Sequence, residues 1–129
     1  MDTDTLLFFN AQPRALPLYC AFEERLSTLF PGVSKRVAKT QITFSCRYAF
    51  ACVSFARVRK KRDLPDPWLV VTLGLPRPLA SGRPAVQTEP YPGRWTVHIV
   101  ISSPADLDDE LWSWVRQAYD FANTKGRKP

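Results

Sequence analysis

The stretch Gln41-Ile42-Thr43-Phe44-Ser45-Cys46-Arg47 alternates polar and apolar side chains along its whole length. A period of two indicates a strand with one buried face, so we expect Ile42, Phe44 and Cys46 to point into a core. The polar residues between them then share the opposite face of the strand. This stretch decides the fold, because the same period recurs on both sides of it, from residue 33 to residue 101.

The region of period two divides into five predicted strands, at 33–39, 41–47, 49–56, 68–75 and 94–102. In the last of these, the apolar residues Trp95, Val97, Ile99 and Ile101 fall on one face. Residues 76–92 are rich in proline, which cannot donate a hydrogen bond to a strand ladder. We therefore expect a long crossing loop or an irregular sheet edge there.

Helices are predicted before this region. Residues 3–9 are expected to form a short helix, and residues 17–30 a longer one with Pro17 in its first turn. The apolar residues of the longer helix recur at spacings of three and four and form one buried stripe: Tyr19, Phe22, Leu26 and Leu29. Pro31 and Gly32 end this helix.

A further helix is predicted after the strands. Ser103 can cap it, and Pro104 suits its first position. Acidic residues lie where the helix dipole favours negative charge: Asp106, Asp108, Asp109 and Glu110. The residues expected to form its core stripe are Leu107, Leu111, Trp114 and Ala118. Residues 124–129 are predicted to form a frayed basic tail.

The resulting order is helix, five-strand antiparallel meander, helix, which is typical of an α+β protein. Helices before and after consecutive antiparallel strands most simply cover one face of the sheet and leave the other face bare. A chain of 129 residues fits one domain over 1–129. We expect the short N-terminal helix and the basic tail at its periphery.

Composition argues against several classes of protein. The start is acidic with a short apolar run, whereas a secretory signal has a basic start and a longer apolar stretch. No segment approaches the ~20 apolar residues that span a bilayer, so no membrane partner is expected. Cys20, Cys46 and Cys52 match neither a disulfide framework nor a zinc motif, which favours a cytoplasmic protein with reduced thiols. We expect no metal and no cofactor, because the sequence contains none of the motifs that bind them.

Four segments carry a resemblance to a known family. They are VAKTQITF at 37–44, LGLPR at 73–77, PYPGRWTVH at 90–98 and SPADLDDEL at 103–111. In this order they resemble the bacterial family catalogued as domain of unknown function 5655. The resemblance implies a small α+β domain without an established activity, sometimes fused to other modules. The helix–meander–helix plan is also similar to the YjbR-type fold, some of whose members are thought to bind DNA.

Positive charge is concentrated in one part of the chain. No acidic residue occurs between Glu24 and Asp63, while basic residues recur throughout that span. A field of one sign attracts a polyanion before any specific contact forms. The residues predicted to form such a surface are Lys35, Arg36, Arg57, Arg59, Lys60, Lys61 and Arg62. The alternative is a solvated edge and loop whose lysines deter edge-to-edge pairing, and the 57–62 run contains no aromatic residue.

A second candidate site lies on the bare face of the predicted sheet. Arginine there can make bidentate contacts to an anionic small molecule. The residues predicted to bind this ligand are Lys39, Thr40, Gln41, Arg47, Arg94, Thr96 and His98. Lys39 and Thr40 can bind an anion or merely fix the connection between two strands. The alternative for the whole set is a face that is polar only because it meets solvent.

His98 is the only histidine and has no predicted carboxylate partner, so we expect no catalytic residue. The leading hypothesis is a non-catalytic binding or accessory domain that engages a polyanion or an acidic partner protein, with nucleic acid the favoured polyanion. The alternative is a small-molecule site on the bare face, with or without enzymatic activity. A homodimer through an uncovered sheet face or edge is a further hypothesis.

Overall fold

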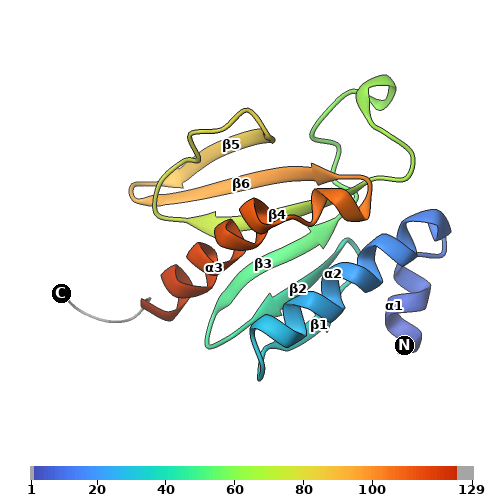
Figure 1. Cartoon of the computed structure of the whole chain (residues 1–129), viewed down its shortest axis with the longest axis horizontal. Coiled ribbons are helices and arrows are strands. Elements are labelled where there is room, and N and C mark those ends of the chain that lie inside the picture. The colour runs from blue at the N-terminus through green and yellow to red at the C-terminus, as the bar shows by residue number, and fades with distance from the viewer. Residues whose placement is uncertain (1, 125–129) are drawn as a thin grey trace.

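The computed structural model describes residues 2–124, which form a six-stranded antiparallel sheet in the order β1-β2-β3-β4-β6-β5 (Figure 1). The strands are β1 (Ser34–Val37), β2 (Gln41–Ser45), β3 (Ala49–Ser54), β4 (Leu69–Leu75), β5 (Pro84–Tyr91) and β6 (Arg94–Ile101). The helices are α1 (Thr3–Phe8), α2 (Leu16–Leu29) and α3 (Asp109–Thr124). Short 3₁₀ turns lie at η1 (Pro13–Ala15), η2 (Lys61–Asp63) and η3 (Pro104–Asp106). The predicted basic tail lies outside the described residues, apart from Thr124.

The α+β meander is confirmed, and one strand is added to it. The five predicted strands correspond to β1, β2, β3, β4 and β6, which are neighbours in that order. The proline-rich segment forms β5 at the outer edge of the sheet, paired only with β6. Pro84 and Pro90 are compatible with this position, because the outer side of an edge strand needs no N–H donors. The expectation of an irregular edge is therefore correct for this segment.

The main core lies between the sheet and the two long helices, α2 and α3, which run across the same face (Figure 1). Phe22 of α2 stacks on Trp112 of α3, with ring centroids 5.2 Å apart, and also contacts Phe44 of β2. Burial of each such side chain contributes roughly 1.5–3 kcal/mol. The predicted stripe of α2 is buried at Tyr19, Phe22 and Leu26, whereas Leu29 is half-buried. The predicted one-sided arrangement of the helices is thus confirmed.

A β-bulge changes the alternation at one end of the β2–β3 hairpin. Phe44 pairs with Ala51 and Ser45 with Ala49, so Phe50 has no partner on β2. Phe50 and Ala51 are consequently both buried, although they are adjacent in the strand. Phe50 packs against Tyr119 of α3, with ring centroids 5.3 Å apart. The extra residue therefore closes this end of the core.

The C-terminal helix begins later than predicted. Ser103 caps the 3₁₀ turn η3, and the Asp106 carboxylate accepts backbone N–H groups from Ser102 at 2.8 Å and Ser103 at 3.2 Å. Leu107 then leaves the helical region, and Asp108 accepts the N–H of Leu111 at the start of α3. The acidic run thus serves two separate N-termini instead of one. No helix within residues 2–124 has the length and apolar character needed to cross a membrane.

Candidate functional site

The residues predicted to bind a ligand lie at two opposite ends of the sheet. We call one the loop end, formed by residues 38–41, the segment 55–68 and the start of β4. The other is the turn end, formed by residues 46–48 and 92–93. Gln41 pairs with Ser54 at the loop end, whereas Arg47 and Arg94 belong to the turn end. Figure 1 shows α1 and the 55–68 segment at the loop end, and the β5–β6 turn at the opposite end.

The strand register separates the predicted bare-face site into two parts. Gln41 lies in a row with Ser54, Val70 and Val100 across four strands. Arg94 is six residues before Val100 on β6, which corresponds to about 20 Å along the strand. One small molecule cannot contact Gln41 and Arg94 at that separation. The combined site is therefore corrected: the residues share a face but not a position along it.

Arg94 packs flat on the sheet. A Cβ atom built at Gly74 would lie 2.6 Å from Nη1 of Arg94, so the guanidinium occupies the space of a missing side chain. Arg94 is half-buried as a result. This contact gives Arg94 a packing role on the bare face beside Thr96, which pairs with Gly74.

His98 belongs to a row of hydrogen-bonded side chains that crosses the bare face. The Gln41 amide donates to Thr43 Oγ1 at 3.0 Å, Cys52 Sγ donates to Gln41 Oε1 at 3.8 Å, and Thr72 Oγ1 lies 2.8 Å from His98 Nδ1. Burial lowers the pKa of His98. Burial also raises the pKa of the Cys52 thiol, against an opposing hydrogen bond from Thr72. Both shifts favour the neutral forms of these two groups.

Three hollows border the loop end within residues 2–124, and the smallest of them is lined by both Asp4 and Lys39. The first, which we call the Thr40 hollow, has a volume of about 440 Å³. Its lining joins the β1–β2 connection to α1 and to the end of β3, and consists of Phe8, Lys39, Thr40, Gln41, Ser54, Phe55 and Ala56. Lys39, Thr40 and Gln41, which were predicted as one motif, thus line one concave surface.

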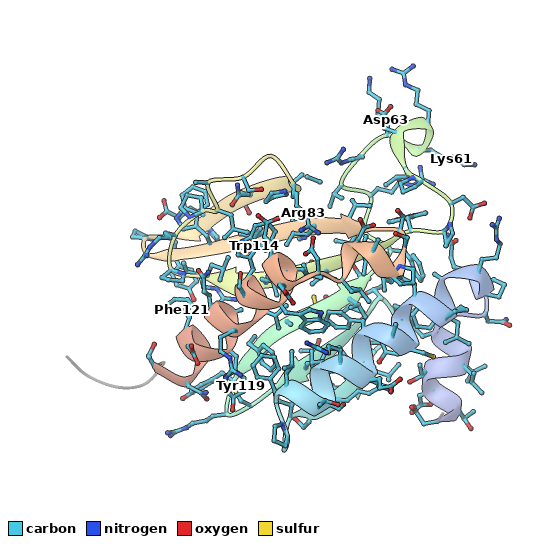
Figure 2. All side chains as sticks on the ribbon, in the orientation of Figure 1. Lys61, Asp63, Arg83, Trp114, Tyr119 and Phe121 are labelled. Carbon is cyan, nitrogen blue, oxygen red and sulfur yellow. The ribbon has the colours of Figure 1, made fainter. Side chains whose placement is uncertain are left out.

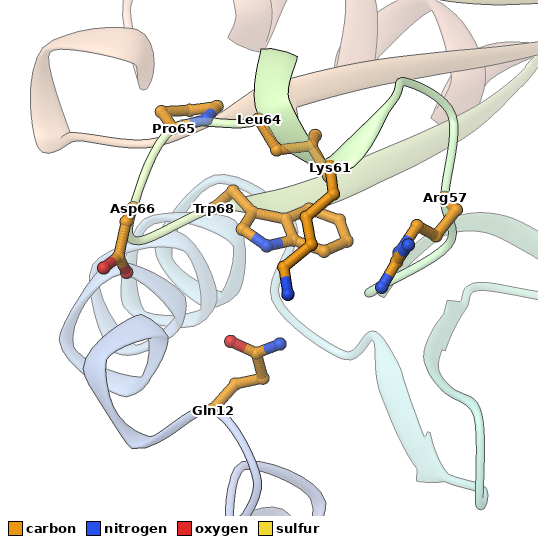
Figure 3. Close-up of a pocket in the computed structure, with 7 residues that line it drawn as sticks. All are labelled: Gln12, Arg57, Lys61, Leu64, Pro65, Asp66 and Trp68. Carbon is orange, nitrogen blue, oxygen red and sulfur yellow. The ribbon is translucent and has the colours of Figure 1, made fainter.

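The second hollow, which we call the Trp68 hollow, has a volume of about 360 Å³ (Figure 3). Its lining residues are Gln12, Arg57, Lys61, Leu64, Pro65, Asp66 and Trp68. Figure 3 shows the side chains of Arg57 and Lys61 directed toward the space between Gln12 and the Trp68 indole. Arg14 donates to the Asp66 carboxylate at 2.7 Å, which neutralises the one acidic group of this lining.

A ladder of aromatic rings connects the Thr40 hollow and the Trp68 hollow. Phe8 stacks on Phe55 with ring centroids 5.8 Å apart, and Phe55 meets Trp68 edge to face at 5.5 Å. Phe8 and Phe55 line the Thr40 hollow, and Trp68 lines the other. All three rings are half-buried. The ladder therefore presents apolar surface within both hollows.

Most of the basic residues predicted to bind a polyanion form no ion pair with an acidic side chain within residues 2–124. Within residues 2–124, every ion pair is made by Arg14, Lys35 or Arg83. The exposed cations that make none include Arg36, Lys39, Arg57, Arg59, Lys60, Lys61 and Arg62. Figure 2 shows Lys61 and Asp63 on the segment that projects beyond the sheet. Three acids lie near these cations in the chain or in a shared lining. Asp63 and Asp4 form no ion pair within residues 2–124, and Asp66 pairs with Arg14.

Lys35 is an exception to the predicted basic surface. Alternation along β1 turns Lys35 toward the helices, where its ammonium contacts Glu23 and lies 2.9 Å from Asp2. Burial alone would lower the pKa of Lys35, but the hydrogen bonds to Glu23 and Asp2 outweigh it and raise the pKa overall. The hydrogen bond from Lys35 is also the largest cause of the lowered pKa of Asp2. Lys35 therefore anchors the N-terminus and is not available to a polyanion.

A family model described as a domain of unknown function, DUF5655, matches residues 7–122. The chain belongs to the DUF5655 family. The matched span contains the linings of both hollows, so the loop end is part of the DUF5655 domain itself. No curated protein and no solved structure gives a significant match to the chain.

Several residues of the loop end of this DUF5655 domain were not predicted from the sequence. Gln12, Phe55 and Trp68 are distant from one another in sequence and follow no common motif. The sequence prediction considered aromatic residues only within the basic run 57–62, which has none. Phe55 and Trp68 flank that run, and the fold brings their rings into contact. Aromatic residues just outside a basic run were the signal that could have identified them.

Proposed function

We propose that this DUF5655 domain is a non-catalytic binding module that holds a polyanion at the loop end of its sheet. One observation carries the proposal. Cations from two separate segments, Lys39 and the pair Arg57 and Lys61, border two hollows that share one aromatic ladder. This arrangement offers charge for an anionic backbone and apolar surface for the groups attached to it.

The overall charge supports the same proposal. The chain has a formal net charge of +6 at pH 7, and its described ion pairs leave the 57–62 segment unpaired by acids. A surface of one sign raises the local concentration of an oppositely charged ligand and accelerates its association. Since the segment projects beyond the sheet, a long polyanion can reach it without entering a deep cleft (Figure 2).

We also propose a cytoplasmic, reducing environment for this domain. Cys46 packs against the core, whereas Cys52 lies on the bare face in the row that includes Thr72. The register of the β2–β3 hairpin therefore directs the two thiols to opposite sides of the sheet. The two thiols are therefore not placed to form a disulfide with each other, which supports the proposal of a reducing environment.

A salt titration tests the proposed function. We would measure the affinity of the domain for a fluorescein-labelled single-stranded oligonucleotide and for labelled heparin, by fluorescence anisotropy between 50 and 300 mM salt (about the range over which phosphate contacts weaken strongly). Binding through Lys39, Arg57 and Lys61 should give a log–log slope of about −2 for the oligonucleotide. Affinity that is independent of salt would contradict the proposal.

Two triple variants distinguish an effect of the loop-end site on binding from an effect of the net charge of the protein. The test variant is K39Q/R57Q/K61Q, and the control is R25Q/R47Q/R77Q, whose arginines are exposed and lie outside both linings. Both variants remove the same charge. We expect the test variant to lose at least tenfold in affinity for both polyanions and the control to lose much less. Equal losses would show that binding follows net charge alone.

A further inference from the structure

We infer that the polyanion is single-stranded nucleic acid, with an unpaired base stacked on Trp68 in the Trp68 hollow. This inference rests on the proposed function and narrows its ligand class. It depends on three features of the loop end: the indole of Trp68, the side-chain amide of Gln12, and the presence of cations and aromatic rings in the same hollows.

The indole of Trp68 provides the stacking surface. It is half-buried and lines an open hollow, while the edge-to-face contact with Phe55 holds it in place. Single-stranded nucleic acids bind proteins by stacking bases on such fixed aromatic rings, and every base has a flat face that can stack. In a duplex these faces are stacked on neighbouring bases, so a double strand would leave the indole uncovered.

Gln12 places a polar group in the same hollow. Its amide carries both a donor and an acceptor, which is the combination that can hydrogen-bond the edge of an unpaired base. The backbone N–H of Gln12 donates to the Phe9 carbonyl at 3.0 Å, so a buried residue fixes this part of the chain. A base stacked on Trp68 would therefore meet the side-chain amide of a residue whose backbone is held in place.

The cations lie where the phosphates of such a strand would run. Arg57 and Lys61 border the Trp68 hollow, and Lys39 borders the Thr40 hollow on the other side of Phe55. Each of these hollows thus combines at least one cationic side chain with at least one aromatic ring, as each nucleotide of a strand combines a phosphate with a base. The hollow volumes of about 360 and 440 Å³ fall in the range of small-ligand sites and not of a groove that accepts a duplex.

The test compares two single strands that differ only in their bases, and adds a duplex whose bases are already stacked. The wild-type domain would be titrated with a labelled 12-nucleotide oligothymidine, with an abasic strand of the same length and phosphate number, and with a 12-base-pair duplex (lengths of about one helical turn). We expect oligothymidine to bind roughly 5- to 100-fold more tightly than the abasic strand, the effect of stacking one base. It should also bind more tightly than the duplex.

Two single variants locate the base. Trp68→Leu should lower oligothymidine affinity to that of the abasic strand and lower heparin affinity by a much smaller factor, because heparin has no base to stack. Gln12→Ala, at an exposed position whose loss spares the core, should lower oligothymidine affinity by a smaller factor. If Trp68→Leu does not fold, the abasic comparison on the wild-type domain decides the inference alone.

The outcomes distinguish this inference from the proposed function. If neither heparin nor any strand binds, the proposed function fails and the inference falls with it. If heparin binds and oligothymidine is no better than the abasic strand, only the inference fails, and an acidic protein partner becomes the better ligand class. A preference for the duplex would also overturn the inference.

Discussion

Arg83 and the basic residues of segment 57–62 carry the same positive charge, but only Arg83 is paired with acidic side chains. Arg83 Nη1 donates to Asp108 at 2.9 Å and to Glu110 at 2.8 Å, and Nη2 donates to the Asp106 carbonyl at 3.0 Å. Its guanidinium also lies 5.3 Å from the ring centre of Trp114 (Figure 2). These contacts join the start of β5 to the start of α3. The cations of 57–62, by contrast, have no acidic partner among residues 2–124.

The difference shows that the neighbours of a basic side chain decide its role, and that its place in a basic run of the sequence does not. A cation paired with acids stabilises the fold, whereas an exposed cation without such a partner is available to a ligand. Lys35 lies in the predicted basic surface but is neutralised by Asp2 and Glu23. Arg57 and Lys61 are equally basic in sequence and remain available. The following predictions test this division, beginning with the largest expected effect.

Reversing the charge of the available cations should abolish binding and spare the fold. We expect R57E/K61E to weaken polyanion binding at least 100-fold at about 0.15 M salt, since two attractive contacts become repulsive. Both residues are exposed, so the free energy of unfolding should change by no more than about 0.5 kcal/mol. Anisotropy titrations and urea denaturation measure the two quantities. A large loss of stability would show that these cations are structural.

Removing Lys35 should have the reverse effect. In Lys35→Met, the half-buried carboxylate of Glu23 and the N-cap carboxylate of Asp2 lose their cation. We expect the free energy of unfolding to fall by about 1–3 kcal/mol, with polyanion affinity reduced only through net charge. Arg36→Met is the matched control, because Arg36 is the exposed neighbour on the same strand. Urea denaturation that gives equal values for the two variants would contradict the structural role of Lys35.

Arg83→Gln should destabilise the domain less than Lys35→Met. Its acidic partners are about half exposed, at 47% for Asp108 and 53% for Glu110, so solvent weakens each pair. We expect a loss of about 1 kcal/mol, measured by thermal or urea unfolding. Arg77→Gln, at an exposed position, should be neutral by comparison. Polyanion affinity should be the same in these two variants. A loss of affinity in Arg83→Gln alone would contradict the assignment of Arg83 to a structural role.

The smallest effect concerns pH. The hydrogen bond from Arg83 is the largest cause of the lowered pKa of Asp108. A carboxylate whose pKa is lower in the folded state contributes stability that is complete above its unfolded value, near pH 4, and is lost as the pH falls through the folded value. The stability difference between wild type and Arg83→Gln should therefore shrink as the pH falls below about 4. A difference that stays constant in acid would show that Arg83 acts through Trp114 and the Asp106 carbonyl and not through its carboxylate partners.

Much of the fold follows from local patterns in the sequence. Strict alternation placed β2 and β6, and spacings of three and four placed the buried stripe of α2. β5 was not resolved as a strand because its stability comes from pairing with β6, against the local preference of Pro84 and Pro90. The start of α3 was misplaced because Ser103 and Asp108 are both good caps, and sequence alone does not show which one begins the helix.

The candidate site was less predictable than the fold. Alternation correctly assigned Gln41 and His98 to one face, but it contains no information on how far apart residues on that face lie. The contact between Phe55 and Trp68 depends on the path of the whole 55–68 segment. The motif of Lys39, Thr40 and Gln41 was the exception, because consecutive residues in a short connection stay together in any fold.

The bulge at Phe50 and the turn before it respond differently to changes in chain length. The connection 46–48 lies outside the strand pairing, so a residue inserted there would leave the pairs Thr43 with Cys52 and Gln41 with Ser54 aligned. Phe50 is buried against Tyr119, so its removal would open the core. An insertion in this turn would therefore lie at the end remote from Trp68 and would preserve the spacing of the strands that border the Thr40 hollow.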